Sequence, residues 1–307
     1  MTSGMVSIFQ SFVGLIPVTL AQSLIVSFVV LGIMLPFRIL SFPDLTSEGA
    51  YPFGGCVCAF LVAAGVHPVA AIALAMLCGF SAGCSTAFIH LRFGINTLLA
   101  GILMLTMLYS INLRVMGRSN ISILGQSTLF DLVSPVHSNS PFLKILLAGG
   151  VAVIILALLH LFFKSEKGIS IRAVGANAEM AEAQGISVWQ ATILGVGTAS
   201  AFSALGGALM VQSQAFADVN MGFGILINGL ASLIIGEAVV GRKTVFRQLA
   251  APFMGAIVYY QLVSLCLAAG MPPPDLKLAT GVFVLIMLAL PSLRRGRLVP
   301  EKAKLRE

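Results

Sequence analysis

Residues 143–163 read LKILLAGGVAVIILALLHLFF, a run of 21 residues in which Lys144 is the one Lys, Arg, Asp or Glu. An α-helix that crosses a membrane needs about 20 consecutive, mostly apolar residues. The run has that length and that composition. It therefore predicts a membrane-spanning helix, and the rest of the chain can be read by the same criterion.

Eight further apolar stretches lie between breaks at Pro, Gly or charged residues, and they cover residues 8–38, 50–64, 68–89, 96–114, 188–212, 223–240, 248–269 and 277–293. The predicted fold is therefore all-α: a polytopic membrane helix bundle with about nine (8–10) transmembrane helices. The range 50–64 is short and contains Gly54 and Gly55. It is open to being a broken or re-entrant helix, and the helix count around residues 39–64 stays open with it.

The composition of the whole chain agrees with this prediction. Of 307 residues, 58% are hydrophobic and 9% are charged, with a mean hydropathy of +1.01. Soluble domains carry about 25% charged residues, so the composition excludes a soluble enzyme and a disordered chain. We expect residues 1–293 to form one transmembrane domain and residues 294–307 to form a basic cytoplasmic tail.

The positions of the Lys and Arg residues predict the orientation. With the N-terminus outside, 14 of the 18 fall in inside segments and four in outside segments. Basic residues collect in cytoplasmic loops, so we expect the N-terminus outside and the C-terminus inside. The net charge of +7 then reflects topology, and no nucleic-acid partner is expected.

Small residues are dense inside the predicted helices. Gly79 and Gly83 form a GxxxG motif, and residues 195–207 read GVGTASAFSALGG. Small residues let membrane helices approach closely, so these motifs predict a packed bundle. The triplet FGI opens two predicted spans, at residues 93–95 and 223–225. The two spans run in opposite directions in the predicted topology, which leaves a weak inverted repeat possible.

The longest predicted cytoplasmic loop, residues 164–187, reads KSEKGISIRAVGANAEMAEAQGIS. Residues 176–184 are rich in helix-forming residues. Asn177 is a candidate N-cap, and Gly185 is a candidate C-terminal glycine. Gly175 is expected to act as a breaker before the helix. The pattern predicts a short helix on the membrane surface, which could be a plain surface helix or a docking element.

Residues 172–186, RAVGANAEMAEAQGI, resemble the cytoplasmic loop of permeases of the branched-chain amino acid/ribose-type ABC importers. Residues 40–54, LSFPDLTSEGAYPFG, resemble a shorter branch of that family, which includes tryptophan/tyrosine-type permeases. The resemblance implies that the loop couples this chain to an ATPase subunit. The implied coupling residues are Arg172, Gly175, Asn177, Glu179, Ala181, Glu182, Gly185 and Ile186.

The resemblance also implies the assembly. Two such permease subunits, identical or similar, would line a pathway through the bacterial cytoplasmic (inner) membrane. Two ATPase subunits would bind ATP and Mg²⁺, and an extracytoplasmic binding protein would deliver a small, amino acid-like and aromatic solute. Sugars, nucleosides or a vitamin are the alternative substrates. No cofactor or metal is expected on this chain. Residues 236–244, GEAVVGRKT, depart from the GxxxxGK[ST] pattern of a nucleotide-binding loop.

Polar residues in or beside the predicted spans are the candidates for the substrate pathway. Acidic side chains in a membrane are costly and tend to line cavities or form pairs, whereas amides often join helices. Simple solvation at the interface and helix-to-helix hydrogen bonds are the alternatives. The candidates are Asp44, Glu48, Asn96, Asn228, Gln212 and Gln214.

Two other classes of protein fit the sequence less well. An ion-coupled secondary transporter favours paired charged residues in the middle of the membrane, and the sequence places none convincingly at the centre of a span. A membrane-embedded enzyme needs a nucleophile, a base or metal ligands that converge, and no such motif is present. The chain is therefore expected to be a transport subunit without catalytic residues.

Overall fold

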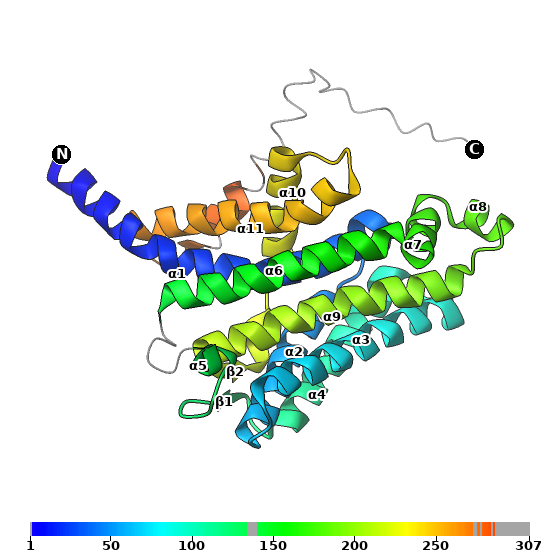
Figure 1. The fold of residues 1–307 in the computed structure, drawn as a ribbon, viewed down its shortest axis with the longest axis horizontal. Helices are drawn as coiled ribbons and strands as arrows, with labels where there is room; N and C mark the ends of the chain where they lie inside the picture. Colours follow the sequence, from blue (N-terminus) through cyan, green and yellow to red (C-terminus); the bar gives the residue numbers. More distant parts are fainter. Residues whose placement is uncertain (1, 134–139, 273–274, 277, 284, 286–307) are drawn as a thin grey trace. The chain divides into compact units, whose positions relative to one another are not determined.

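The computed structural model describes residues 2–133, 140–272, 275–276, 278–283 and 285 (Figure 1). These residues belong to two compact units. One unit comprises the terminal segments, residues 1–15 and 262–307, and the other comprises residues 16–261. The candidate sites described below all lie in the second unit.

The described part of the chain is built mainly of α-helices. They are α1 (Thr2–Met34), α2 (Thr46–Ala63), α3 (Pro68–Phe93), α4 (Thr97–Met116), α5 (Leu129–Val133), α6 (Pro141–Lys164), α7 (Glu166–Ala176), α8 (Ala178–Ala183), α9 (Val188–Gln214), α10 (Ile225–Val240) and α11 (Val245–Ala268). A π-helical turn, η1 (Leu35–Ile39), follows α1, and a 3-10 turn, η2 (Val219–Gly222), precedes α10.

Eight of the nine predicted ranges coincide with helices α1, α2, α3, α4, α6, α9, α10 and α11. The ninth, 277–293, lies largely outside the described residues, as does the tail 294–307. Within the described part of the chain, seven helical segments are long and apolar enough to cross a membrane. The structure thus confirms a polytopic all-α membrane bundle, while the count of about nine spans stays a prediction.

Helix α2 corresponds to the predicted short range 50–64 and differs from the other seven helices. It has 18 residues and is not among the seven candidate spans, although almost all of it is buried. At 1.5 Å per residue it rises about 27 Å, close to the roughly 30 Å of a bilayer core. Its surroundings are other helices, since it packs against α3, α4 and α9 (Figure 1). The structure shows a continuous helix, with Pro52 inside it.

Close backbone approach explains the small residues of α2, α3 and α9. A Cβ atom on Gly207 of α9 would lie 1.9 Å from the carbonyl oxygen of Tyr51 in α2. One on Gly79 would lie 2.4 Å from the Cβ of Ala204, and one on Gly83 would lie 2.4 Å from the carbonyl oxygen of Val196. The GxxxG motif therefore packs on α9, which confirms the predicted use of small residues in a packed bundle.

Local signals set several helix ends. Asn96 caps α4, since its side chain accepts a hydrogen bond from the backbone N–H of Leu98 at 2.9 Å. Gly94 and Gly117 end α3 and α4 in the left-handed conformation, with φ of 66° at both. Such residues are the usual caps and terminators of helices. The boundaries of α3 and α4 therefore follow from the sequence.

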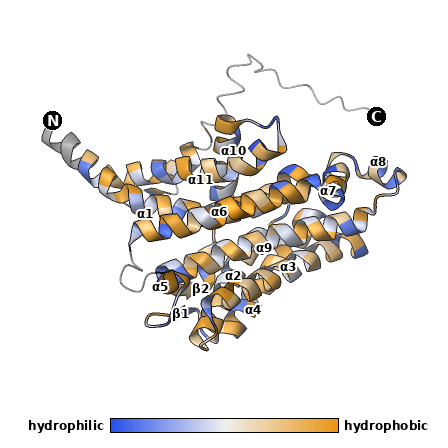
Figure 2. Cartoon of the chain, in the orientation of Figure 1, coloured by the Kyte–Doolittle hydropathy of each residue, from blue (hydrophilic) through white to orange (hydrophobic). Residues whose placement is uncertain are grey.

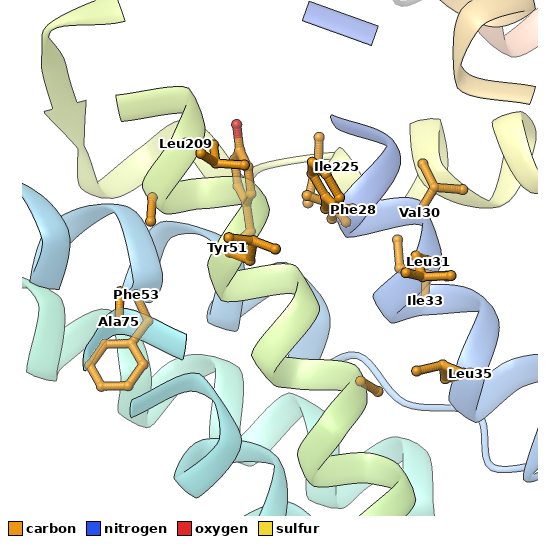
Figure 3. Packing of buried hydrophobic residues seen from close by; sticks show 14 of the residues in the cluster. Phe28, Val30, Leu31, Ile33, Leu35, Tyr51, Phe53, Ala75, Leu209 and Ile225 are labelled. Carbon is orange, nitrogen blue, oxygen red and sulfur yellow. The ribbon is translucent and has the colours of Figure 1, made fainter. Parts of the chain in front are cut away.

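The apolar core of the second unit includes the C-terminal half of α1 (Figure 3). Ile25, Phe28, Leu31 and Ile33 are fully buried. The ring of Phe28 meets that of Phe253 in α11 edge to face, with centroids 5.8 Å apart. This half of α1 is therefore an interior helix. Helix α6 differs, because apolar residues cover most of its exposed surface (Figure 2).

A two-stranded antiparallel sheet follows two of the helices. Strand β1 (Asn120–Ser122) comes after α4 and strand β2 (Phe216–Asp218) comes after α9. Ile121 pairs with Ala217 at the centre of the sheet. The sheet thereby joins the C-terminal ends of α4 and α9.

Candidate coupling loop and translocation site

The predicted short helix of the 164–187 loop is α8, and both predicted caps are confirmed. The side chain of Asn177 accepts a hydrogen bond from the N–H of Met180 at 2.9 Å. At the other end, Gly185 has a φ of +80°, and the N–H of Ile186 donates to the carbonyl of Ala181 at 3.0 Å. This is the Schellman pattern of helix termination. Local sequence alone therefore defines α8.

The expectation that Gly175 breaks the chain before this helix is wrong. Gly175 lies in the last turn of a separate helix, α7, which begins at Glu166. Ser165 is its N-cap. The glycine is needed for packing, because a Cβ atom there would lie 1.7 Å from the carbonyl oxygen of Ile39. The loop therefore contains two helices, with Asn177 between them.

Helix α7 packs against both η1 and α9. Its residues Ile171 and Val174 are buried. On the α9 side, a Cβ atom on Gly195 would lie 2.3 Å from Cδ1 of Leu40 and 3.4 Å from Cγ2 of Ile171. Leu40, directly after η1, thus lies where α7 and α9 meet. Helix α7 is therefore in contact with the end of η1 and with the first half of α9.

Helix α8 itself is exposed. Helix α8 mixes polar and apolar residues, with Glu179 and Glu182 among its six (Figure 2). Of the eight residues that the resemblance assigns to coupling, Arg172, Asn177, Glu179, Glu182 and Gly185 are exposed, while Gly175 and Ile186 are partly buried and Ala181 is buried. Met180, which was not among them, is 66% exposed. An exposed methionine on a rigid helix is an adaptable apolar contact for another protein.

A charged cluster connects η1 to α10. Arg38 in η1 donates to the carboxylate of Glu237 at 2.8 Å, and Arg242, just after α10, pairs with the same oxygen. The Glu237 side chain is 5% exposed, whereas Arg38 and Arg242 are 38% and 55% exposed. Solvent screens such pairs, so their main effect is to orient η1 against α10.

Three of the predicted pathway residues make hydrogen bonds inside the bundle. Asp44 is fully buried and accepts from the N–H and hydroxyl of Thr46 at the start of α2. Gln212 is 2% exposed, donates to the carbonyl of Pro68 at 3.1 Å and accepts from the N–H of Leu129 at 2.7 Å. Asn96 caps α4, as described above. These contacts are of the kind that joins or caps helices.

The other three predicted pathway residues differ from one another. Asn228 of α10 accepts a hydrogen bond from the hydroxyl of Tyr259 at 2.9 Å. Gln214, at the end of α9, is exposed. Glu48 is partly buried at the start of α2, and its carboxylate accepts from the N–H of Gly224 at 2.9 Å. Glu48 lines a small niche, which also involves Tyr109. Gln212 and Gln214 line two other cavities, of about 420 Å³ and about 120 Å³.

Asn112 and Phe223 also line this niche, and sequence reasoning did not select them. Asn112 is 1% exposed and its Oδ1 has no hydrogen-bond partner. Asn112 is the sixteenth of the twenty residues of α4. A polar residue inside an apolar span was the available signal, but it could not be told from an ordinary helix-to-helix contact. No cluster of three or more His, Cys, Asp or Glu side chains suited to a metal is present among the described residues.

The described part of the chain is a bundle of apolar helices of membrane-spanning length with a capped, exposed loop helix, which is a construction found in transport subunits. The family model for the permease component of branched-chain amino acid transport systems matches residues 16–291. The chain is 38% identical over 288 residues to the tyrosine transport system permease protein of Clostridioides difficile (strain R20291), a match covering 92% of this chain and 95% of that relative. No solved structure matches it.

A second relative is an uncharacterized protein of Rickettsia prowazekii (strain Madrid E), 34% identical over 274 residues, which are 88% of this chain and 95% of the relative. The chain belongs to the family of permease components of branched-chain amino acid transport systems. It is a multi-pass inner-membrane protein and a permease subunit of an ABC importer of the amino acid type. The resemblance recognised in the sequence is thereby confirmed.

Proposed function

We propose that this permease moves an aromatic amino acid, with L-tyrosine as the leading substrate, and that α8 is the element through which ATPase subunits drive it. The family and the name of the Clostridioides difficile relative support the substrate class. The observation that carries the mechanism is the packing of α7, which joins an exposed, doubly capped helix to η1 and α9.

The proposed mechanism uses rigid elements. Closure of two ATPase subunits on ATP would displace α8. Helix α7 would transmit the displacement, because the backbone of Gly175 contacts that of Ile39 and leaves no compressible side chain between them. Segment η1 would carry it to α10 through Glu237. Two permease subunits would then rock between inward-open and outward-open states around the pathway. This chain does no covalent chemistry.

Uptake into proteoliposomes tests the proposal. The permease, its ATPase and its binding protein are reconstituted, and uptake of radiolabelled L-tyrosine, ribose and adenosine is compared with and without ATP. We expect ATP-dependent uptake of tyrosine alone. Uptake of ribose or adenosine instead of tyrosine would contradict an amino acid substrate and would assign the permease to sugars or nucleosides. Accumulation of tyrosine by the permease without any ATPase would contradict the coupling mechanism and favour the ion-coupled alternative.

The proposed orientation, with the N-terminus outside, makes a separate prediction. A cysteine at Leu124, in the exposed turn after β1, is expected to react with a membrane-impermeant maleimide in intact cells. A cysteine at Glu179 on α8 is expected to react only after the membrane is opened. The native background is measured in the parent chain, because Cys78, Cys84 and Cys266 are partly exposed, whereas Cys56 and Cys58 are buried. The reverse labelling pattern would overturn the topology.

A further inference from the structure

The niche at Glu48 lies inside the membrane-spanning part of the protein. A Cβ atom on Gly49, the next residue, would lie 3.1 Å from the Cα of Leu105. Leu105 is the ninth of the twenty residues of α4, a candidate span, and therefore lies near its middle. The carboxylate of Glu48 accordingly lies at a depth where a charged group needs a partner or a water-filled path.

The start of α10 lies at the same place. The N–H of Gly224, which precedes α10, donates to Glu48. Helix α10 has 16 residues, which rise about 24 Å and fall short of a bilayer core of about 30 Å. The candidate span begins at Val219, so the 3-10 turn η2 and residues 223–224 supply the rest of its length without α-helical geometry. Such backbone is tolerated where it is buried in protein or lines an aqueous cavity, and discontinuous helices of this kind form substrate sites in transporters.

The niche presents acceptors and aromatic rings. It encloses about 30 Å³ between α2, α4 and η2, with Glu48, Tyr109, Asn112 and Phe223 among its lining residues. No basic side chain among the described residues forms a salt bridge with Glu48. The unpaired Oδ1 of Asn112 leaves a second acceptor without a donor. Tyr109 and Phe223 are 42% and 67% exposed, so their rings are not absorbed into the core.

We infer that this niche binds the primary ammonium group of the transported amino acid as it passes through the permease. This inference rests on the proposed function. An ammonium group offers three donors and no acceptor, which suits a carboxylate and an amide oxygen. It is similar in size to water, and a volume of about 10–15 Å³ or more admits one such group. Aromatic rings also attract cations.

Other ligands fit the niche less well. A substrate carboxylate would meet the like charge of Glu48, which is repulsive at short range. A divalent metal ion would find one carboxylate where Ca²⁺ takes six to eight oxygen ligands. A guanidinium group presents a planar fork of five donors, which exceeds the volume of the niche. The amine is the part of an amino acid that matches it.

The test is the variant Glu48→Gln. The amide oxygen can still accept from the N–H of Gly224, so the fold is retained while the negative charge is lost. In the assembled importer we expect uptake of radiolabelled L-tyrosine to fall about ten- to a hundredfold. This is the loss of affinity expected when one hydrogen bond to a charged group is removed. ATP hydrolysis stimulated by the binding protein is expected to persist, because α8 is untouched. Asp275→Asn, a carboxylate-to-amide change at an exposed residue that belongs neither to the niche lining nor to the coupling loop, is the matched control.

A second variant keeps the inference falsifiable if Glu48→Gln assembles poorly. Asn112→Leu leaves Glu48 and its hydrogen bond from Gly224 in place, removes the second acceptor of the niche, and is expected to lower tyrosine uptake several-fold. Unchanged uptake by Glu48→Gln, with wild-type uptake intact, would overturn the inference and leave the proposed function standing. Wild-type uptake that depends on a pH gradient and loses this dependence in Glu48→Gln would also overturn it, by assigning a proton to the niche. Failure of the wild-type importer to carry any amino acid would contradict the proposed function itself.

Discussion

Replacing Gly185 with valine is expected to reduce ATP-driven uptake by about tenfold or more while the protein remains inserted in the membrane. Gly185 ends α8 with a φ of +80°. A side-chain-bearing residue pays about 1–2 kcal/mol in this conformation, and a β-branched one is a clear outlier there. A six-residue helix with one buried side chain has little packing energy to offset that cost.

The matched control is Gly185→Asn, because asparagine tolerates the left-handed conformation. No atom lies within 4 Å of a Cβ atom at this position, so both side chains have space and the two variants differ in backbone preference. The measurement is tyrosine uptake together with ATP hydrolysis by the assembled importer. We expect the valine variant to lose coupling and the asparagine variant to keep most of it. Equal coupling in the two variants would contradict a mechanical role for α8.

Replacing Gly207 with alanine is expected to destabilise the bundle by about 3 kcal/mol or more. The added Cβ atom would lie 1.9 Å from the carbonyl oxygen of Tyr51, which belongs to the backbone of α2 and cannot rotate away. Helices α2 and α9 would have to separate along their length. The measurement is the thermal transition of the detergent-solubilised permease, followed by the loss of monodisperse protein on size-exclusion chromatography.

Gly150→Ala provides the comparison for that experiment. Gly150 lies on an exposed face of α6, and a Cβ atom there has no neighbour within 4 Å. Alanine has a higher helix propensity than glycine, so this variant is expected to melt at the wild-type temperature or slightly above it. If Gly207→Ala melts at the same temperature as Gly150→Ala, the contact between α2 and α9 can accommodate the added methyl group without loss of stability. That result would contradict the prediction.

The membrane helices could be predicted from the sequence because their signal is contiguous. Apolar runs of membrane-spanning length define α3, α6 and α9, and residues such as Gly94 and Asn96 mark where helices end and begin. The caps of α8 were readable for the same reason, since Asn177 and Gly185 act on neighbours within a few positions. Helix α7 was missed because Gly175 is read as a breaker unless its packing partner, Ile39, is known.

The candidate niche illustrates what sequence reasoning cannot supply. Glu48, Asn112 and Gly224 are far apart in the chain, and only the packing of α2, α4 and η2 brings them together. Asp44 and Glu48 look equivalent as acidic residues beside a span. The structure separates them, because Asp44 is fully buried, with one carboxylate oxygen bonded to Thr46 and the other without a hydrogen-bond partner, whereas Glu48 faces a cavity. The role of a polar residue depends on its hydrogen-bond partners and on its depth in the membrane, and the local sequence specifies neither.

The small sheet formed by β1 and β2 has a consequence for how α9 can move. Its three residue pairs connect the C-terminal ends of α4 and α9. The N-terminal end of α9 follows directly from the loop that carries α8. A helix held at one end and pushed at the other tilts about the held end and does not slide along its axis. In the proposed mechanism the sheet would therefore act as a pivot, and the amplitude of the motion of α9 would grow with distance from Gln214 toward Val188.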